Sequence, residues 1–212
     1  RRDTFLNAII SLNPNVLIEA RAKDRLRQKE LEHPIYGMPV LLKDNINALP
    51  MVTSAGAAAF SDNVPQSDAF LVKQLKDKGA LVLGKVNLSE WAYYFCQGCP
   101  VGYSAMGGQT LNPYGRRQFE TGGSSSGSGV AVAANYAVAA IGSETSGSIL
   151  SPSGKNSVVG LKPTIGAVSR SGVVPISSTL DTAGPMTKNV VDNAILLSAI
   201  TGLDSKDSYS YA

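Results

Sequence analysis

The sequence contains a single histidine, and this scarcity argues against the most common general base of serine hydrolases. His33 lies in the polar stretch KELEHPIYG, directly before Pro34, which is typical of a solvated residue at a turn. We therefore do not expect a Ser-His-Asp triad. Serine chemistry in this chain would need a different base.

Cysteine is equally scarce, because Cys96 and Cys99 are the only two and they form the short motif CQGC. A structural zinc site needs about four ligands, mostly Cys and His, so no metal site and no cofactor is expected. A redox pair usually opens a helix, whereas Gly98 and Pro100 indicate a loop here. A loop disulfide or two unreactive thiols is the favoured interpretation, and redox chemistry is the less favoured alternative.

The sequence also lacks charge runs and long apolar runs. Its 19 basic and 16 acidic residues give a net charge of +3, with no run of five like charges, so nothing indicates nucleic acid or a membrane as a partner. Asn135 and Tyr136 interrupt the most apolar segment, which is too short for a membrane helix of about 20 residues. With 43% hydrophobic residues, the composition is that of a soluble globular protein. Such a protein can be cytoplasmic or exported, and the composition indicates no oligomeric state.

The chain begins with Arg1 rather than Met and stops in GLDSKDSYSYA, so we interpret it as a fragment. Apolar periodicity and turn signals predict alternating helices and strands, which indicates an α/β protein with a central mixed β-sheet flanked by helices. The expected helices are a segment capped by Asp3 or Thr4 and ending at Leu12, residues 15–31, residues 68–78 capped by Ser67, residues 128–138, and a segment from about Thr187 to Gly202. The expected strands are residues 38–44, residues 80–86, a segment ending at Ile141, and two strand-like pieces at 157–164 and 172–177.

Two Gly/Ser-rich runs, GGSSSGSG (122–129) and GSETSGSI (142–149), flank the apolar segment VAVAANYAVAAI. They do not mark a linker, because the segment that joins them has to be core. Backbone N–H groups can converge on an anion before a buried helix. The phosphate-binding spacings are absent, however, and tight turns that permit close packing remain the alternative interpretation.

Lys43 ends the apolar run PVLL and is followed by Asp44. A lysine at the end of a buried strand is desolvated, which lowers its pKa and allows it to act as a general base. The alternative is structural: the ammonium reaches the surface or pairs with Asp44.

Several long runs of this sequence resemble the amidase signature family. They are YGMPVLLKDNI, LVLGKVNLSEWA, GGSSSGSG, GSETSGSI, VVGLKPTIGAVSRSGVVPIS and LDTAGPMTKNV, in this order and over essentially the whole chain. The sequence of these motifs, with GGQTLNPY before GGSSSGSG, is more similar to the bacterial peptide-amidase-like branch than to the tRNA-amidotransferase subunits.

The resemblance implies a Ser-cisSer-Lys triad. Its lysine falls on Lys43, its cis-serine on Ser124 and its nucleophile on Ser148, 24 residues further along the chain. Backbone N–H groups of the loop before the nucleophile would stabilise the oxyanion; these belong to Thr145, Ser146 and Gly147. The other serines are interpreted as turn-formers or minor hydrogen-bond donors, namely Ser125, Ser126, Ser128, Ser143 and Ser146.

The activity implied is hydrolysis of a carboxamide, either a small amide or the C-terminal amide of a peptide, through an acyl-serine intermediate. Two alternatives stay open: the glutamine-hydrolysing subunit of an amidotransferase, and a truncated, non-catalytic amidase-like module that binds ligands or partners. The chain departs from the family where Leu150 replaces an arginine that follows the nucleophile in many members. Residues 1–212 would form only the N-terminal part of the domain, and a molecule ending at Ala212 is expected to be poorly folded and inactive.

Overall fold

A six-stranded mixed sheet forms the centre of the computed structural model, which describes residues 5–26, 33–96 and 98–211. The strand order is β1-β3-β2-β6-β8-β7, with β2 parallel to β3 and β6 and the remaining pairs antiparallel. The strands are β1 (Ile9–Leu12), β2 (Pro39–Lys43), β3 (Leu81–Val86), β6 (Ala139–Glu144), β7 (Val159–Gly160) and β8 (Thr182–Thr187), and β4 (Tyr103–Ser104) pairs with β5 (Gly108–Gln109) in a separate hairpin. The predicted fold class, an α/β protein with a mixed sheet, is confirmed.

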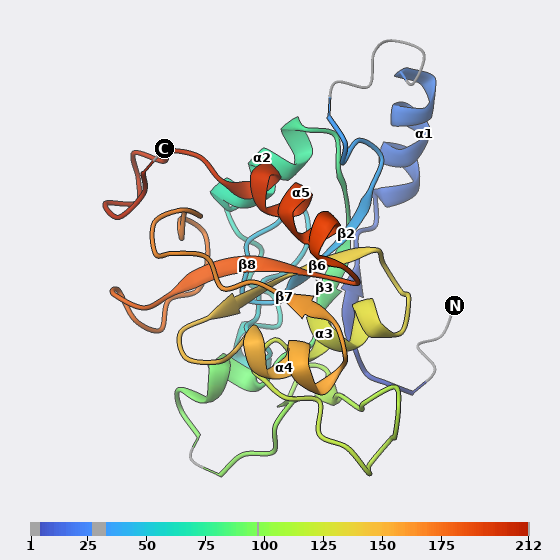
Figure 1. Cartoon of the computed structure of the whole chain (residues 1–212), viewed down its shortest axis with the longest axis vertical. Helices are drawn as coiled ribbons and strands as arrows, with labels where there is room; N and C mark the ends of the chain where they lie inside the picture. The colour runs from blue at the N-terminus through green and yellow to red at the C-terminus, as the bar shows by residue number, and fades with distance from the viewer. Residues whose placement is uncertain (1–4, 27–32, 97, 212) are drawn as a thin grey trace.

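Helices cover both faces of this sheet (Figure 1). Helices α2 (Phe70–Asp77) and α5 (Val190–Ile200) lie together on one face, and α3 (Ser126–Ala133) and α4 (Leu150–Lys155) lie on the other. Helix α1 (Val16–Leu26) follows the edge strand β1, and two short 3₁₀ helices span Ala58–Phe60 and Glu90–Tyr93.

The core has two layers because side chains of a strand alternate between the faces of its sheet. On β2, Val40 and Leu42 join the apolar cluster under α2 and α5, whereas Leu41 joins the cluster around Val130 and Val132 of α3. Lys43 is the last residue of this strand, which is buried on both faces.

Two predictions about the first half of the chain need correction, and a third is tested only in part. The helix expected to end at Leu12 is instead the strand β1, which pairs with β3. The next helix is described over Val16–Leu26, and its predicted continuation to residue 31 lies outside the described part of the chain. Ser67 does not cap α2, because Ala69 precedes that helix without a side-chain cap.

The second half of the chain also differs in detail from the prediction. The buried helix starts two residues earlier than predicted and ends at Ala133. After a turn, the chain enters the strand β6, which continues to Glu144, beyond the predicted end at Ile141. Only Val159–Gly160 of the first strand-like piece pairs as a strand. The segment 172–177 makes a single bridge, between Val173 and Ile46. Strand β8 was not predicted, because Gly184 and Pro185 are unusual in a strand interior.

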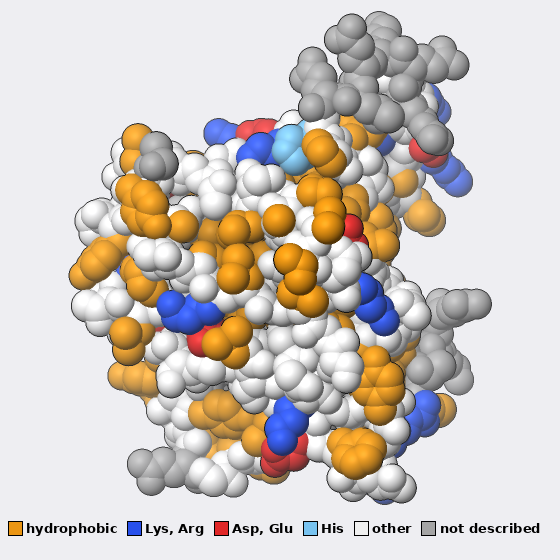
Figure 2. Space-filling model, viewed as in Figure 1, with side chains coloured by type: hydrophobic (Ala, Val, Ile, Leu, Met, Phe, Trp, Pro, Cys, Tyr) orange, Lys and Arg blue, Asp and Glu red, His pale blue; other side chains and the backbone are white. Residues whose placement is uncertain are grey.

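Charged side chains are scattered over the face shown in Figure 2 and form no continuous basic patch there. Within the described ranges, no helix combines the length and apolar character needed to cross a bilayer.

Candidate active site

The ends of two parallel neighbouring strands place the candidate residues at one edge of the sheet. Leu42 of β2 pairs with Ile141 of β6. Lys43 follows Leu42 directly, and its Nζ reaches Ser143, two residues beyond Ile141. The chain leaves β6 into the loop that carries Ser148. Ser124 comes from the turn that precedes α3, the helix packed against β6.

Lys43 is fully buried and faces hydroxyl and carbonyl oxygens rather than a carboxylate. Its Nζ donates to Ser124 Oγ at 2.7 Å, to the Ser143 carbonyl oxygen at 3.1 Å and to Ser143 Oγ at 3.0 Å. Burial lowers the pKa of Lys43 to about 7, and the more distant charges of Glu144 and Asp181 oppose this shift only in part. A lysine with this pKa is substantially neutral at neutral pH and can accept a proton.

Asp44 does not pair with Lys43, because it belongs to a separate buried network. Its carboxylate accepts from Lys85 Nζ at 3.2 Å and from the hydroxyl of Ser54. Lys85 also donates to Thr53 Oγ1 at 3.1 Å. Both structural alternatives for Lys43 are therefore wrong: its ammonium neither reaches the surface nor pairs with Asp44.

Ser124 and Ser148 line the same narrow cavity, beside Asn45 and Ser143. Ser124 is fully buried and follows a cis peptide bond, whereas Ser148 is 8% exposed. The backbone N–H of Ser125 donates to the Ser148 carbonyl oxygen at 3.1 Å, which ties the two loops together. The structure thus brings Lys43 and Ser124 into contact and places Ser148 on the same cavity wall.

The loop from residue 145 to residue 148 presents backbone donors. Glu144 Oε2 accepts from the N–H of Ile149 at 2.7 Å and from that of Leu150 at 3.0 Å, which fixes the far end of the loop. Gly147 has a φ of +78°, a conformation that favours glycine. In the described part of the chain, no acceptor receives the N–H groups of Thr145, Ser146 or Gly147, and Thr145 lines the cavity together with Ser124 and Ser148.

Sequence reasoning missed Ser143 and Asn45 as parts of the site. Ser143 is not a turn-former: it lies in β6, and its Oγ accepts from Lys43 and from Asn45 Nδ2, the latter at 2.9 Å. The sequence pattern gave no signal for either residue, because Asn45 lies in the turn after β2 and the contact of Ser143 with Lys43 depends on the pairing of β2 with β6. Asn45 Oδ1 is buried, and no hydrogen-bond partner for it is found among the described residues.

The remaining serines and the cysteines act structurally. Ser126 and Ser128 donate to the carbonyl oxygens of Gly122 and Ile141, as predicted for minor donors. Cys96 and Cys99 form a disulfide, one of the two favoured interpretations of CQGC. His33 is half-buried, its Nδ1 accepts from the N–H of Ile35, and it lines no part of the cavity around Ser124.

Comparisons with known proteins identify relatives of this chain. The native peptide amidase of Stenotrophomonas maltophilia shares 55% identity and a TM-score of 0.94 with this structure, over 97% of this chain and 42% of that one. A probable amidase of Arabidopsis thaliana is 47% identical over 96% of this chain and 40% of its own length. A glutamyl-tRNA(Gln) amidotransferase subunit of Akkermansia muciniphila is 43% identical over 98% of this chain and 42% of its own length.

The chain therefore spans about 40% of the length of the relatives that it matches. The family model named Amidase matches residues 2–212, nearly the entire sequence. This match, the shared mixed sheet and the identities above lead to one conclusion: the chain belongs to the amidase signature family.

Proposed function

We propose that this chain carries the catalytic centre of an amidase in which Ser148 is the nucleophile, Ser124 relays protons and Lys43 is the general base. The single observation that supports this most is the 2.7 Å contact between the Lys43 Nζ and the Ser124 Oγ, made by a buried lysine with a pKa near 7. Serine hydroxyls are weak nucleophiles until a base takes their proton, and the site offers this base without histidine.

The reaction begins when Lys43 takes the proton of Ser124, whose oxygen in turn takes the proton of Ser148. The Ser148 oxygen attacks the amide carbonyl carbon, and the oxyanion accepts hydrogen bonds from the loop N–H groups of residues 145–147. The proton returns through Ser124 to the leaving nitrogen, the C–N bond breaks, and an acyl-serine ester remains. Water then cleaves this ester along the same proton path and restores Ser148.

The proposed substrate is the C-terminal amide of a peptide or a smaller carboxamide. The 55% identity to a peptide amidase supports the peptide amide. Leu150 stands where many family members have an arginine after the nucleophile. This position therefore supplies no fixed cation that could bind an anionic acyl group.

Ammonia release from a dipeptide amide, measured against pH, tests the proposal. The rate should rise with pH through a midpoint near 7, because only neutral Lys43 accepts a proton. Lys43→Ala should lower kcat by about 10²–10⁴-fold, whereas Lys73→Ala, which removes an exposed lysine on α2, should leave it unchanged. A Lys43→Ala variant with the wild-type rate at neutral pH would contradict the role of Lys43.

The 43% identity to a subunit of an amidotransferase supports a second candidate, glutamine hydrolysis coupled to a partner protein. The same three residues would perform this reaction. Glutaminase activity that appears only with a co-purifying partner would favour this candidate, and hydrolysis of peptide amides by the isolated protein would favour the first. An intact protein that hydrolyses neither substrate would favour the non-catalytic binding module.

A further inference from the structure

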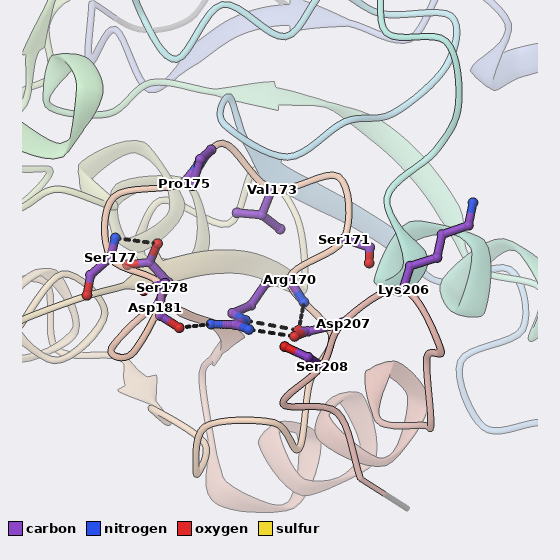
Figure 3. A pocket seen from close by; sticks show the side chains of 10 residues that line it. All are labelled: Arg170, Ser171, Val173, Pro175, Ser177, Ser178, Asp181, Lys206, Asp207 and Ser208. Atoms are coloured by element: carbon purple, nitrogen blue, oxygen red, sulfur yellow. Dashed lines mark hydrogen bonds and ion pairs between the residues drawn. The ribbon is translucent and has the colours of Figure 1, made fainter.

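The half-buried carboxylate of Asp181 joins two loops at the edge of the candidate site. Its Oδ1 accepts from Thr145 Oγ1 at 2.5 Å. Its Oδ2 accepts from the backbone N–H groups of Ile176 and Ser177, at 2.7 Å and 2.9 Å. Figure 3 shows Asp181 beside Ser177 and near Arg170, in the wall of a cavity of about 280 Å³.

The sheet register explains why Asp181 reaches Thr145. Glu144, the last residue of β6, pairs with Thr182, the first residue of β8. Thr145 and Asp181 are the next residues beyond this pair, so they face each other where the two strands separate. The loop that starts at Thr145 is thus held by Asp181 at its beginning and by Glu144 at its end.

We propose that Asp181 is a positioning residue for acyl transfer. It holds Thr145, and through it the loop whose N–H groups face the developing oxyanion. From the wall of the cavity that Ser124 and Ser143 also line, where both contact Lys43, it places a negative charge near that lysine. This inference rests on the proposed function. Oxyanion donors act only when their positions are fixed before the reaction, so a side chain that anchors their loop affects the rate rather than substrate binding.

The charges around Lys43 come from few groups. Glu144 at the end of β6 and Asp181 before β8 both act to raise the pKa of Lys43, against the larger lowering by burial. Asp44 and Lys85 lie nearby but pair with each other, and Arg170, which lines the same cavity as Ser124, forms an ion pair with Asp207. Removing the Asp181 charge should therefore lower the pKa of Lys43 and extend activity to lower pH.

A local role is the structural alternative, because the contacts of Asp181 Oδ2 stabilise only the turn at residues 176–177. Two substitutions separate the roles. Thr145→Val removes the hydroxyl that binds Oδ1 and leaves the charge in place. Asp181→Asn removes the charge, while its amide oxygen still accepts from the turn and its amide nitrogen can donate to Thr145 Oγ1.

The experiment measures kcat, KM and the pH profile of peptide-amide hydrolysis for the wild type and both variants, with Thr179→Val, an exposed threonine of the same loop, as the control. Thr145→Val should lower kcat by about ten- to a hundredfold, and it should leave KM and the acid limb of the pH–rate profile unchanged. Asp181→Asn should move the acid limb to lower pH. Thr179→Val should match the wild type.

Two results would overturn the inference: a Thr145→Val variant with wild-type kcat, or an Asp181→Asn variant whose acid limb stays at the wild-type pH. If the wild type is active and Ser148→Ala is not, either result removes only the role of Asp181. A wild type that hydrolyses no amide would overturn the proposed function and this inference together. Thermal unfolding of each variant, expected within a few degrees of the wild type, separates these effects from misfolding.

Discussion

At the scale of single residues, the decisive balance is the one that sets the charge of Lys43. Burial removes water from the ammonium and lowers its pKa, while Glu144 and Asp181 raise it, and burial prevails. The pairing of Asp44 with Lys85 matters for this outcome, because an unpaired carboxylate beside Lys43 would favour its charged form.

This balance predicts how stability depends on pH. The pKa of Lys43 is about 7 in the folded protein and about 10.5 in the unfolded chain, so between these values the unfolded chain binds more protons. The free energy of unfolding should therefore rise with pH from about 7 to about 10.5. Burial lowers the pKa of Lys85 as well, which adds a rise of the same sign.

Lys43→Met isolates the contribution of Lys43, since it keeps a long side chain without a titrating group. Urea unfolding at several pH values from 7 to 10 should give a slope that is smaller by up to about 1.4 kcal/mol per pH unit than the wild-type slope. An identical slope in the two proteins would mean that Lys43 titrates alike in the folded and unfolded states.

At the scale of elements, close packing of α3 sets the position of Ser124. Gly127 has no room for a side chain: a Cβ there would lie 2.6 Å from the Ala8 carbonyl oxygen and 2.5 Å from the Asn87 backbone nitrogen. The small residues of GGSSSGSG thus let the helix approach the backbone beyond β3. The turn before α3 can then reach Lys43 at the end of β2.

Substitution of glycine by alanine tests this packing. Gly127→Ala should lower the free energy of unfolding by about 1–3 kcal/mol, because a backbone contact has to shift. Gly154→Ala in α4 is the matched control, since nothing lies within 4 Å of the added Cβ, and it should stabilise the protein by up to about 1 kcal/mol. Chemical unfolding of both variants measures the two effects, and equal stabilities would contradict this account of α3.

At the scale of the whole molecule, the sequence predicts those buried strands that are formed by continuous apolar runs. The apolar runs ending at Lys43 and Val86 became β2 and β3 as expected. Strand β8 was missed although all six of its residues are buried, because its composition resembles a turn and only its position between β6 and β7 makes it a strand. Tertiary pairing thus decided what local preference could not.

The residues of the candidate site could likewise be predicted only in part. Lys43 could be proposed as a base from the apolar run before it, whereas Ser124 and Ser148 were selected among many serines by resemblance to a family. Ser143 and Asp181 carried no sequence signal of their own, because their contacts with Lys43 and Thr145 depend on the register between strands. Neither register nor side-chain direction can be read from one sequence.

Labelling with a serine-reactive fluorophosphonate, followed by peptide mass spectrometry, identifies the nucleophile itself, because the probe forms a stable bond only with an activated serine. We expect one adduct, on Ser148, formed faster as the pH rises through about 7 and absent from Ser148→Ala. An adduct on another serine, or equal labelling of Ser148→Ala, would contradict this expectation.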